Sequence, residues 1–248
     1  MICPDLVKSR FEKSFATYDA HAAVQADVSR RLFEAWQRQR PPAGRLLELG
    51  CGTGQLTRRL AGLNGLERVY LNDLCRQSAG LTALFPAGCA RFLAGDMESV
   101  ALPQDLDAVL SASAVQWVND LPRLLGCCAR SLKRGGWLVL SSFGPQHYAE
   151  IKALTGIGLA YHELAQYRDW LAPQFELVWT AEETRRLLFE RPAAVLAHMR
   201  HTGVSGVRRT PWSRRQWQAF AADYAARFGS PAGVPLTYHP LWILARKK

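Results

Sequence analysis

Apolar residues near the N-terminus recur at helical spacing. Two stripes of large side chains follow one another, and members of the second stripe lie four residues apart. Residues at i and i+4 share one face of a helix, so the pattern predicts a helix over residues 5–39. The Pro-Pro-Ala-Gly run at 41–44 ends it. The stripes are Leu6, Phe11, Phe15 and Tyr18, then Val24, Val28, Leu32 and Trp36.

From residue 45 the pattern changes to short apolar runs separated by amphipathic segments. The runs predict strands at 45–49, 68–72, 90–94, 106–111 and 136–143. The segments between them predict helices at 55–63, 75–85 and 121–132. Strands that alternate with helices through short connections form parallel sheets, so we expect an α/β fold with a mostly parallel sheet and helices on both faces.

After residue 144 helical patterns predominate. They predict helix over 146–171, 193–200 and 213–228, a sixth strand over 175–184 and a last strand over 236–245, which makes a seven-stranded sheet. Helices inserted between late strands would form a helical cap over the carboxyl edge, where open α/β sheets bind ligands. We expect one domain over 1–248, with an N-terminal helical region (1–40), a core (41–145), a region containing the cap (146–235) and the last strand (236–248).

The formal charge of +10 is concentrated at one end of the chain. Residues 185–248 hold twelve lysines and arginines but two acids, while the other 184 residues hold nineteen of each sign. Such asymmetry indicates a polyanionic partner, which could be a nucleic acid, an acidic protein or a membrane surface. The alternative is a solvated basic face without a partner.

The remaining composition favours an ordinary cytoplasmic protein. The six cysteines form no CxxC pair and no zinc-like spacing, which predicts reduced thiols and no metal site. No apolar run approaches the roughly 20 residues that a membrane helix needs. Residues 1–13 carry charges and no apolar stretch with a cleavage site, so we expect no signal peptide.

A glycine-rich turn follows the first predicted strand. The segment reads Leu46-Leu47-Glu48-Leu49-Gly50-Cys51-Gly52-Thr53-Gly54. Glycines allow a tight turn and a close approach of the backbone to a ligand. Position 55 is glutamine, so the dinucleotide pattern GxGxxG is absent, and an acid precedes the turn. This form suits a cofactor that carries an amino acid and no phosphate, although any tight strand–helix turn could use three glycines.

Later strands end in further polar signals. Asp73, 19 residues after Gly54, could accept hydrogen bonds from both ribose hydroxyls, or it could cap the next helix. Asp96 could bind the adenine amine while Met97 packs on the ring, or it could cap a loop. Trp117 could stack on a cation or belong to the core.

These signals in order resemble the class I S-adenosylmethionine-dependent methyltransferases over about residues 40–145. The resemblance implies a Rossmann-like fold and S-adenosylmethionine as cofactor. It implies a cofactor site made of Glu48, Gly50, Cys51, Gly52, Gly54, Asp73, Leu74, Asp96, Met97 and Ser113.

Other segments resemble one group within that class, the malonyl-[acyl-carrier protein] O-methyltransferases of biotin synthesis. The similar segments are 7–11, 15–19 with Gln25, 114–117, 132–136, 142–145, 201–206 and 236–240. The resemblance implies methylation of the free malonyl carboxylate on acyl-carrier protein. The ester masks the charge, so that fatty-acid enzymes can extend the chain toward pimeloyl.

A carboxylate with a pKa near 4 is ionised at neutral pH and needs no general base. Catalysis is then mostly positioning. Arginine is suited to grip the carboxylate through two parallel hydrogen bonds, although each candidate arginine, taken alone, fits a surface charge better than the anchor. Tyr18 and Gln25 could close over the methionine part of the cofactor, or pack in the core and on a helix surface. The catalytic candidates are Tyr18, Trp117, Arg200, His201, Arg208, Arg209, Tyr238 and His239.

The basic quarter would meet the acidic acyl-carrier protein at Arg208, Arg209, Arg214 and Arg215. The alternatives are a tRNA or other nucleic-acid methyltransferase, a small-molecule carboxyl methyltransferase and a non-enzymatic binding module. The chain has no Asn-Pro-Pro-Tyr or Asp-Pro-Pro-Tyr segment for a flipped base, so we expect no nucleic-acid partner, and we expect no membrane partner. The choice of arginine, of carrier protein or coenzyme A, and of oligomeric state stays open.

Overall fold

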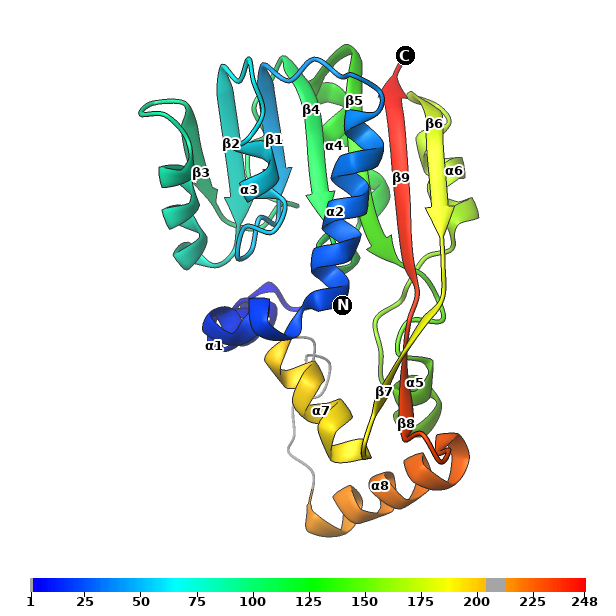
Figure 1. The fold of residues 1–248 in the computed structure, drawn as a ribbon. Coiled ribbons are helices and arrows are strands. Elements are labelled where there is room, and N and C mark those ends of the chain that lie inside the picture. Colours follow the sequence, from blue (N-terminus) through cyan, green and yellow to red (C-terminus); the bar gives the residue numbers. More distant parts are fainter. Residues whose placement is uncertain (1, 204–212) are drawn as a thin grey trace.

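A central seven-stranded sheet organises the chain in the computed structural model, which describes residues 2–203 and 213–248 (Figure 1). The strand order is β3-β2-β1-β4-β5-β9-β6, and β9 alone runs antiparallel to its two neighbours. The predicted mostly parallel, seven-stranded sheet is therefore confirmed. Its strands are β1 (Arg45–Leu49), β2 (Arg68–Asp73), β3 (Ala90–Ala94), β4 (Leu106–Ala112), β5 (Leu132–Phe143), β6 (Phe175–Glu182) and β9 (Pro240–Lys247).

Helices cover both faces of this sheet, as predicted. On one face α2 (Ala23–Gln37) and α3 (Thr57–Leu60) pack against Leu46, Leu110 and Leu244. On the other face α4 (Leu121–Ser131) and α6 (Leu164–Leu171) pack against Leu47 and Val109. Successive strand residues enter opposite cores because their side chains alternate across the sheet.

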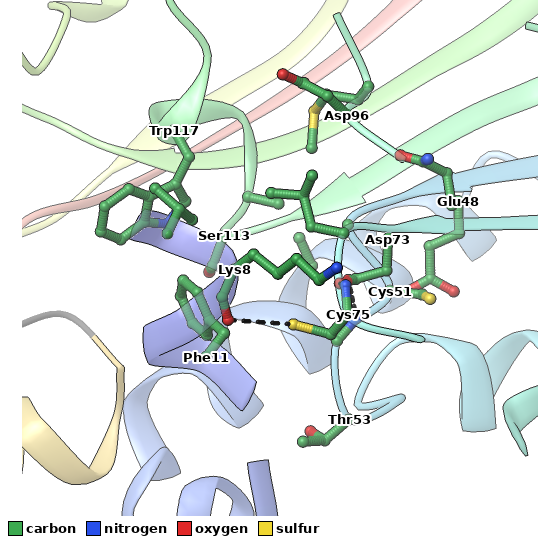
Figure 2. A pocket seen from close by; sticks show the side chains of 18 of the residues that line it. Lys8, Phe11, Glu48, Cys51, Thr53, Asp73, Cys75, Asp96, Ser113 and Trp117 are labelled. Atoms are coloured by element: carbon green, nitrogen blue, oxygen red, sulfur yellow. Dashed lines mark hydrogen bonds between the residues drawn. The ribbon is translucent and has the colours of Figure 1, made fainter. Parts of the chain in front are cut away.

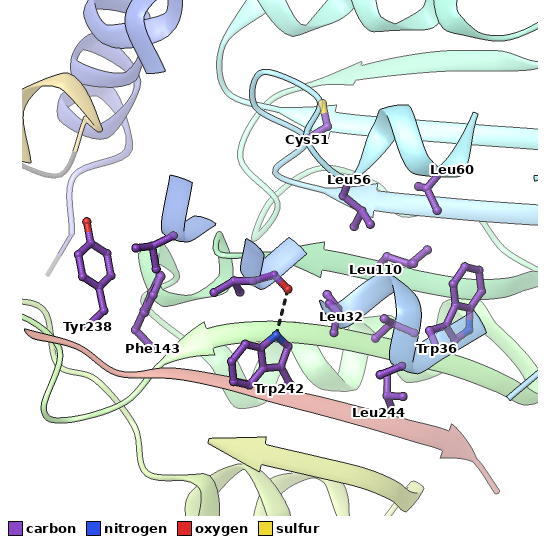
Figure 3. Packing of buried hydrophobic residues seen from close by; sticks show 14 of the residues in the cluster. Leu32, Trp36, Cys51, Leu56, Leu60, Leu110, Phe143, Tyr238, Trp242 and Leu244 are labelled. Atoms are coloured by element: carbon purple, nitrogen blue, oxygen red, sulfur yellow. Dashed lines mark hydrogen bonds between the residues drawn. The ribbon is translucent and has the colours of Figure 1, made fainter. Parts of the chain in front are cut away.

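Helix α2 is fastened to the sheet by its apolar stripe (Figure 3). Leu32 and Trp36 are fully buried, and burial of such a side chain contributes about 1.5–3 kcal/mol. Trp242 of β9 donates a hydrogen bond from Nε1 to the Val28 carbonyl at 3.0 Å. The helix thus lies fixed on one face of the sheet.

The single N-terminal helix predicted over 5–39 is wrong, because α1 (Pro4–His21) ends before α2 begins. The break is at Ala22, whose φ of −94° and ψ of 39° leave the helical region. Neither proline nor glycine marks this position. Tertiary packing sets it, since Ala22 is fully buried and α1 turns away to contact the cap.

The last predicted strand is in fact two strands in different sheets. β8 (Val234–Tyr238) pairs with β7 (Arg185–Phe189), and β9 starts at Pro240, which has no amide hydrogen to continue the ladder. The predicted helical cap therefore also contains a two-stranded sheet. Its helices are α5 (Ala149–Thr155), α7 (Pro192–His201) and α8 (Arg214–Phe228).

Other predicted helices are shorter than expected. Residues 146–171 form α5 and α6 with a loop between them, because Gly156 ends α5 with a φ of +66°. The segment predicted as helix over 75–85 is a 3₁₀ helix, η1 (Arg76–Leu84). None of the described helices has both the length and the apolar character that crossing a bilayer requires. The division into regions of one domain stays a prediction.

Candidate active site

The turn after β1 is held to the end of β2 by Asn72. The amides of Gly50 and Cys51 both donate to the Asn72 carbonyl oxygen, at 2.9 and 3.0 Å. The Asn72 side chain donates from Nδ2 to the carbonyls of Leu93 and Gly95, both at 2.9 Å. One fully buried asparagine therefore joins the carboxyl ends of β1, β2 and β3. Our sequence analysis missed it, although a polar residue ending a buried strand was a usable signal.

Glycine is required in this turn by conformation and by space. Gly50 has a φ of +70°, and a Cβ there would lie 2.4 Å from the Ala114 Cβ. Gly52 has a φ of +53° and borders open space, with no atom within 4 Å of the position of a Cβ. A ligand can therefore approach the backbone closely at Gly52.

Glu48 is buried beneath the turn. Its Oε2 accepts a hydrogen bond from the Thr57 hydroxyl at 2.7 Å, and burial raises the pKa of its carboxyl group to about 8. The carboxyl group therefore mostly holds its proton at neutral pH. A cationic group bound nearby would favour the ionised form.

Asp73 ends β2 against the same turn. Its Oδ2 accepts from the Gly52 amide and its Oδ1 from the Cys75 amide, each at 2.7 Å. The side chain thus binds amides of the surrounding loops and does not cap the next helix, whose N-cap is Cys75. Each of its oxygens keeps a further lone pair for a ligand hydroxyl. Asp96 after β3 likewise accepts from the Glu98 amide at 2.9 Å while facing the pocket with Met97.

These residues surround one pocket at the carboxyl edge of the sheet (Figure 2). Every predicted cofactor residue except Gly54 lines it, and so does Trp117. Gly54 has a φ of +92°, and a Cβ there would lie 2.5 Å from Leu81 Cδ2, so backbone conformation and packing explain that glycine. The lining residues are Tyr18, Gln25, Glu48, Gly50, Cys51, Gly52, Asp73, Leu74, Asp96, Met97 and Ser113.

Helix α1 supplies a wall that sequence analysis had read mainly as a helix stripe. Val7, Lys8, Phe11 and Phe15 line the pocket beside Tyr18. The Phe11 ring stands edge-on to Trp117, with ring centroids 5.6 Å apart. The apolar stripe of α1 was a usable signal, because apolar side chains on a helix need a surface to cover. Here part of the covered surface is the ligand pocket.

The structure does not bring the other catalytic candidates into this pocket. Arg200 is exposed, and His201 stacks on His21 with ring centroids 4.3 Å apart. His239 instead joins cap and core, since its Nδ1 accepts from the Gln146 amide at 3.2 Å. Arg208 and Arg209 lie outside the described residues.

Tyr238 is fully buried behind the pocket in a network of polar groups. Its hydroxyl lies 2.6 Å from His198 Nε2 and accepts a hydrogen bond from the Tyr148 hydroxyl at 3.1 Å. Burial raises the pKa of Tyr238 to about 12, so the phenol stays protonated. Its position suits a structural support for Gln25, whose side chain it faces.

Several solved protein structures are similar to this fold. The YcgJ protein of Bacillus subtilis superposes with a TM-score of 0.61 at 12% identity, over 88% of this chain and 99% of that one. An S-adenosylmethionine-dependent methyltransferase from Mesorhizobium loti gives 0.54 at 20% identity, over 86% and 96%. A Haemonchus contortus phosphoethanolamine N-methyltransferase solved with S-adenosylhomocysteine gives 0.52 at 16%, over 84% and 49%. These similarities establish the Rossmann-like methyltransferase fold.

Sequence relatives match almost the whole chain. The family model "Methyltransferase domain" matches residues 47–140. Malonyl-[acyl-carrier protein] O-methyltransferases from Haemophilus influenzae and Acinetobacter baylyi are each 36% identical, over 97% and 98% of this chain and 93% and 96% of their own. The corresponding protein of Prosthecochloris aestuarii is 37% identical over 98% of this chain and 93% of its own.

The pocket fits S-adenosylmethionine as its cofactor. Three acids, Glu48, Asp73 and Asp96, face it against one lysine, Lys8. Burial alone keeps Glu48 protonated, but a bound ammonium would favour its ionised form. This balance suits a cofactor that carries an ammonium and a sulfonium, and it disfavours a diphosphate. Among the described residues no group of three histidines, cysteines or acids is placed to hold a metal ion.

Gly52→Ala should weaken S-adenosylhomocysteine binding at least tenfold, because its methyl group would occupy ligand space. Gly65→Ala is the matched control, since Gly65 has a φ of +77° and no atom near its missing Cβ, but lies outside the pocket. Both variants should lose roughly 1–2 kcal/mol of unfolding free energy to backbone strain. Calorimetric titration checks the affinities. Equal affinities in the two variants would contradict the role of Gly52.

Glu48→Gln should change how stability depends on pH. Wild-type Glu48 holds its proton up to about pH 8 when folded, but its ordinary pKa is 4.5. The unfolded chain therefore ionises first, and wild type loses stability as pH rises between these values, on the order of 4 kcal/mol.

The variant lacks this loss, so its unfolding free energy relative to wild type should rise from pH 4.5 to pH 8. Urea denaturation at several pH values measures it. The exposed Glu176→Gln is the control and should show no such trend. A constant difference between Glu48→Gln and wild type would mean that the carboxyl titrates normally.

The glycine turn, the acids at the strand ends and the cap occur on one chain that full-length relatives match from end to end. This chain therefore belongs to the malonyl-[acyl-carrier protein] O-methyltransferase family of S-adenosylmethionine-dependent methyltransferases.

Proposed function

We propose that this protein transfers a methyl group from S-adenosylmethionine to the free carboxylate of malonyl-acyl-carrier protein, giving the malonyl methyl ester. The observation that carries the proposal is the match to relatives of that name over nearly the whole length, cap included. Methylation would remove the charge, so that fatty-acid enzymes can extend the thioester toward pimeloyl for biotin.

The residues of the site need to position the reacting groups, and they need not transfer a proton. The bound cofactor would supply a methyl group already activated on a sulfonium. A carboxylate oxygen would take the methyl group as the carbon–sulfur bond breaks and leaves its electron pair on sulfur, so the residues of the site need to move no proton. Burial raises the pKa of Tyr18, which therefore keeps its proton and is able to donate a hydrogen bond to a ligand in the pocket it lines. Trp117 and Ser113 line the same pocket as Tyr18.

The compartment and the alternatives follow from the same proposal. We place the reaction in the cytoplasm, which is supported by six cysteines that are all free thiols. The relatives compared above carry the acyl-carrier-protein name, so a nucleic-acid or small-molecule methyltransferase is not favoured.

Mass spectrometry of malonyl-acyl-carrier protein tests the function directly. After incubation with S-adenosylmethionine and the protein, the carrier should gain one methyl group, and hydrolysis of the ester should remove it. Acetyl-acyl-carrier protein, which has no free carboxylate, is the control and should stay unchanged. Methylation of tRNA without methylation of the malonyl carrier would replace this function with the nucleic-acid alternative.

The carrier protein is proposed to dock on the basic end of α8. Ser213 caps this helix by accepting from the Gln216 amide at 3.3 Å, and Arg214 and Arg215 follow as exposed side chains. These two arginines would present positive charge to an acidic partner. Arg208 and Arg209, which precede them in the sequence, lie outside the described residues.

The double variant Arg214→Glu/Arg215→Glu should therefore raise KM for malonyl-acyl-carrier protein about tenfold, without changing S-adenosylhomocysteine affinity. Arg123→Glu/Arg130→Glu on α4 is the matched control, because both side chains are exposed and the change in net charge is the same. Steady-state kinetics at low ionic strength measure the effect. Equal KM values for the two double variants would remove α8 as the docking site.

A further inference from the structure

A small cavity adjoins the cofactor pocket. Phe11, Tyr18, Gln25, Ser113 and Trp117 line both spaces, so the two meet at these residues. The small cavity continues between Phe143 at the end of β5 and cap residues, including Tyr161 and Thr202. An acceptor that reaches the methyl group from the side opposite the cofactor would enter this space.

The small cavity carries no formal positive charge on its described lining. Neither lysine nor arginine is among those residues. Its one imidazole, His147, is 3% exposed, and burial together with nearby His239 holds its pKa well below the ordinary value. His147 is therefore neutral at neutral pH. An anion in this cavity would meet only uncharged groups from the part of the chain that the structure describes.

Buried polar atoms without partners gather at this cavity. Gln25 Oε1, Ser113 Oγ and Gln116 Oε1 are inaccessible to solvent and make no hydrogen bond. Gln25 is only 5% exposed, and it lines both spaces. Buried polar groups are seldom left unpaired, so such a cluster indicates a polar ligand. A half-turn of the Gln25 carboxamide exchanges its oxygen and nitrogen, which lets it present an N–H group instead.

Two tyrosines on the lining carry the other groups able to donate a hydrogen bond. Tyr18 and Tyr161 line the small cavity, and burial raises the pKa of both, so each keeps its proton. The Tyr161 ring stands edge-on to His147, with ring centroids 5.0 Å apart. This contact orients the Tyr161 side chain in the loop between α5 and α6.

We propose that the malonyl carboxylate is held in this cavity by neutral donors, the Tyr161 hydroxyl and the Gln25 carboxamide, rather than by an arginine. The proposal rests on the proposed function and names how that site takes its substrate. It is an alternative to the arginine grip expected from the sequence, of whose candidates Arg208 and Arg209 lie outside the described residues.

The charge balance of the reaction explains a neutral site. The cofactor sulfonium already provides the positive charge that attracts the carboxylate, and methyl transfer neutralises both. A buried guanidinium would stabilise the anion before reaction and would be left without a partner once the neutral ester formed. Neutral donors position the carboxylate without these penalties.

The first test uses two variants. Tyr161→Phe and Gln25→Ala should each lower kcat/KM for malonyl-acyl-carrier protein by tenfold or more. Tyr161→Phe should leave S-adenosylhomocysteine affinity within about twofold, because Tyr161 lines only the small cavity. Tyr70→Phe on β2 is the matched control and should behave as wild type. Thermal melting confirms that each variant is folded.

The second test needs no substitution. Binding of malonyl-acyl-carrier protein is compared with binding of its carboxamide analogue, malonamyl-acyl-carrier protein, in the presence of S-adenosylhomocysteine. That product lacks the sulfonium charge, so a neutral cavity should bind acid and amide within about tenfold of each other. An arginine grip would favour the acid by about a hundredfold or more.

A hundredfold preference for the acid, or unchanged kinetics in both variants, would overturn the proposal. If the proposed function itself were wrong, the wild-type protein would not methylate malonyl-acyl-carrier protein at all, which distinguishes that outcome from failure of the neutral subsite. Normal wild-type turnover with no effect of Tyr161→Phe or Gln25→Ala would reject only the neutral subsite.

Discussion

The site depends on the hydrogen bonds that Asn72 makes at the carboxyl edge of the sheet. Its carbonyl receives two amides from the turn after β1, and its side chain binds two carbonyls at the end of β3. The glycine turn, Asp73 and Asp96 come from three strands, yet this single residue sets their relative positions. A parallel sheet brings strand ends together, and the asparagine fixes the ends to one another.

Local sequence signals were enough for the sheet but not for the cap. Strands β1 and β3 have the predicted limits, because short apolar runs between turn residues depend little on distant contacts. The break at Ala22 and the pairing of β7 with β8 depend on contacts far along the chain. No local pattern marks Ala22, and Pro240 only in retrospect separates β8 from β9.

The same division holds for the site. Cofactor residues at strand ends could be predicted because topology alone brings them to one edge, and nine of the ten predicted there line the pocket. Arg200, His201 and His239 were chosen by residue chemistry without knowledge of direction, and they point elsewhere. Tyr161 was missed because a tyrosine in a loop has no distinguishing pattern. The cavity it lines exists only once α1, β5 and the cap are assembled.

Helix α1 lines both the cofactor pocket and the adjoining cavity, and it also contacts α7. Ligands in either space therefore touch the same eighteen-residue segment. Thermodynamic linkage is reciprocal, so the free energy a ligand gains from α1 is returned as resistance of that helix to local unfolding. A ligand in one space would therefore also steady part of the wall of the other, and α1 is the element through which the two binding events would be linked.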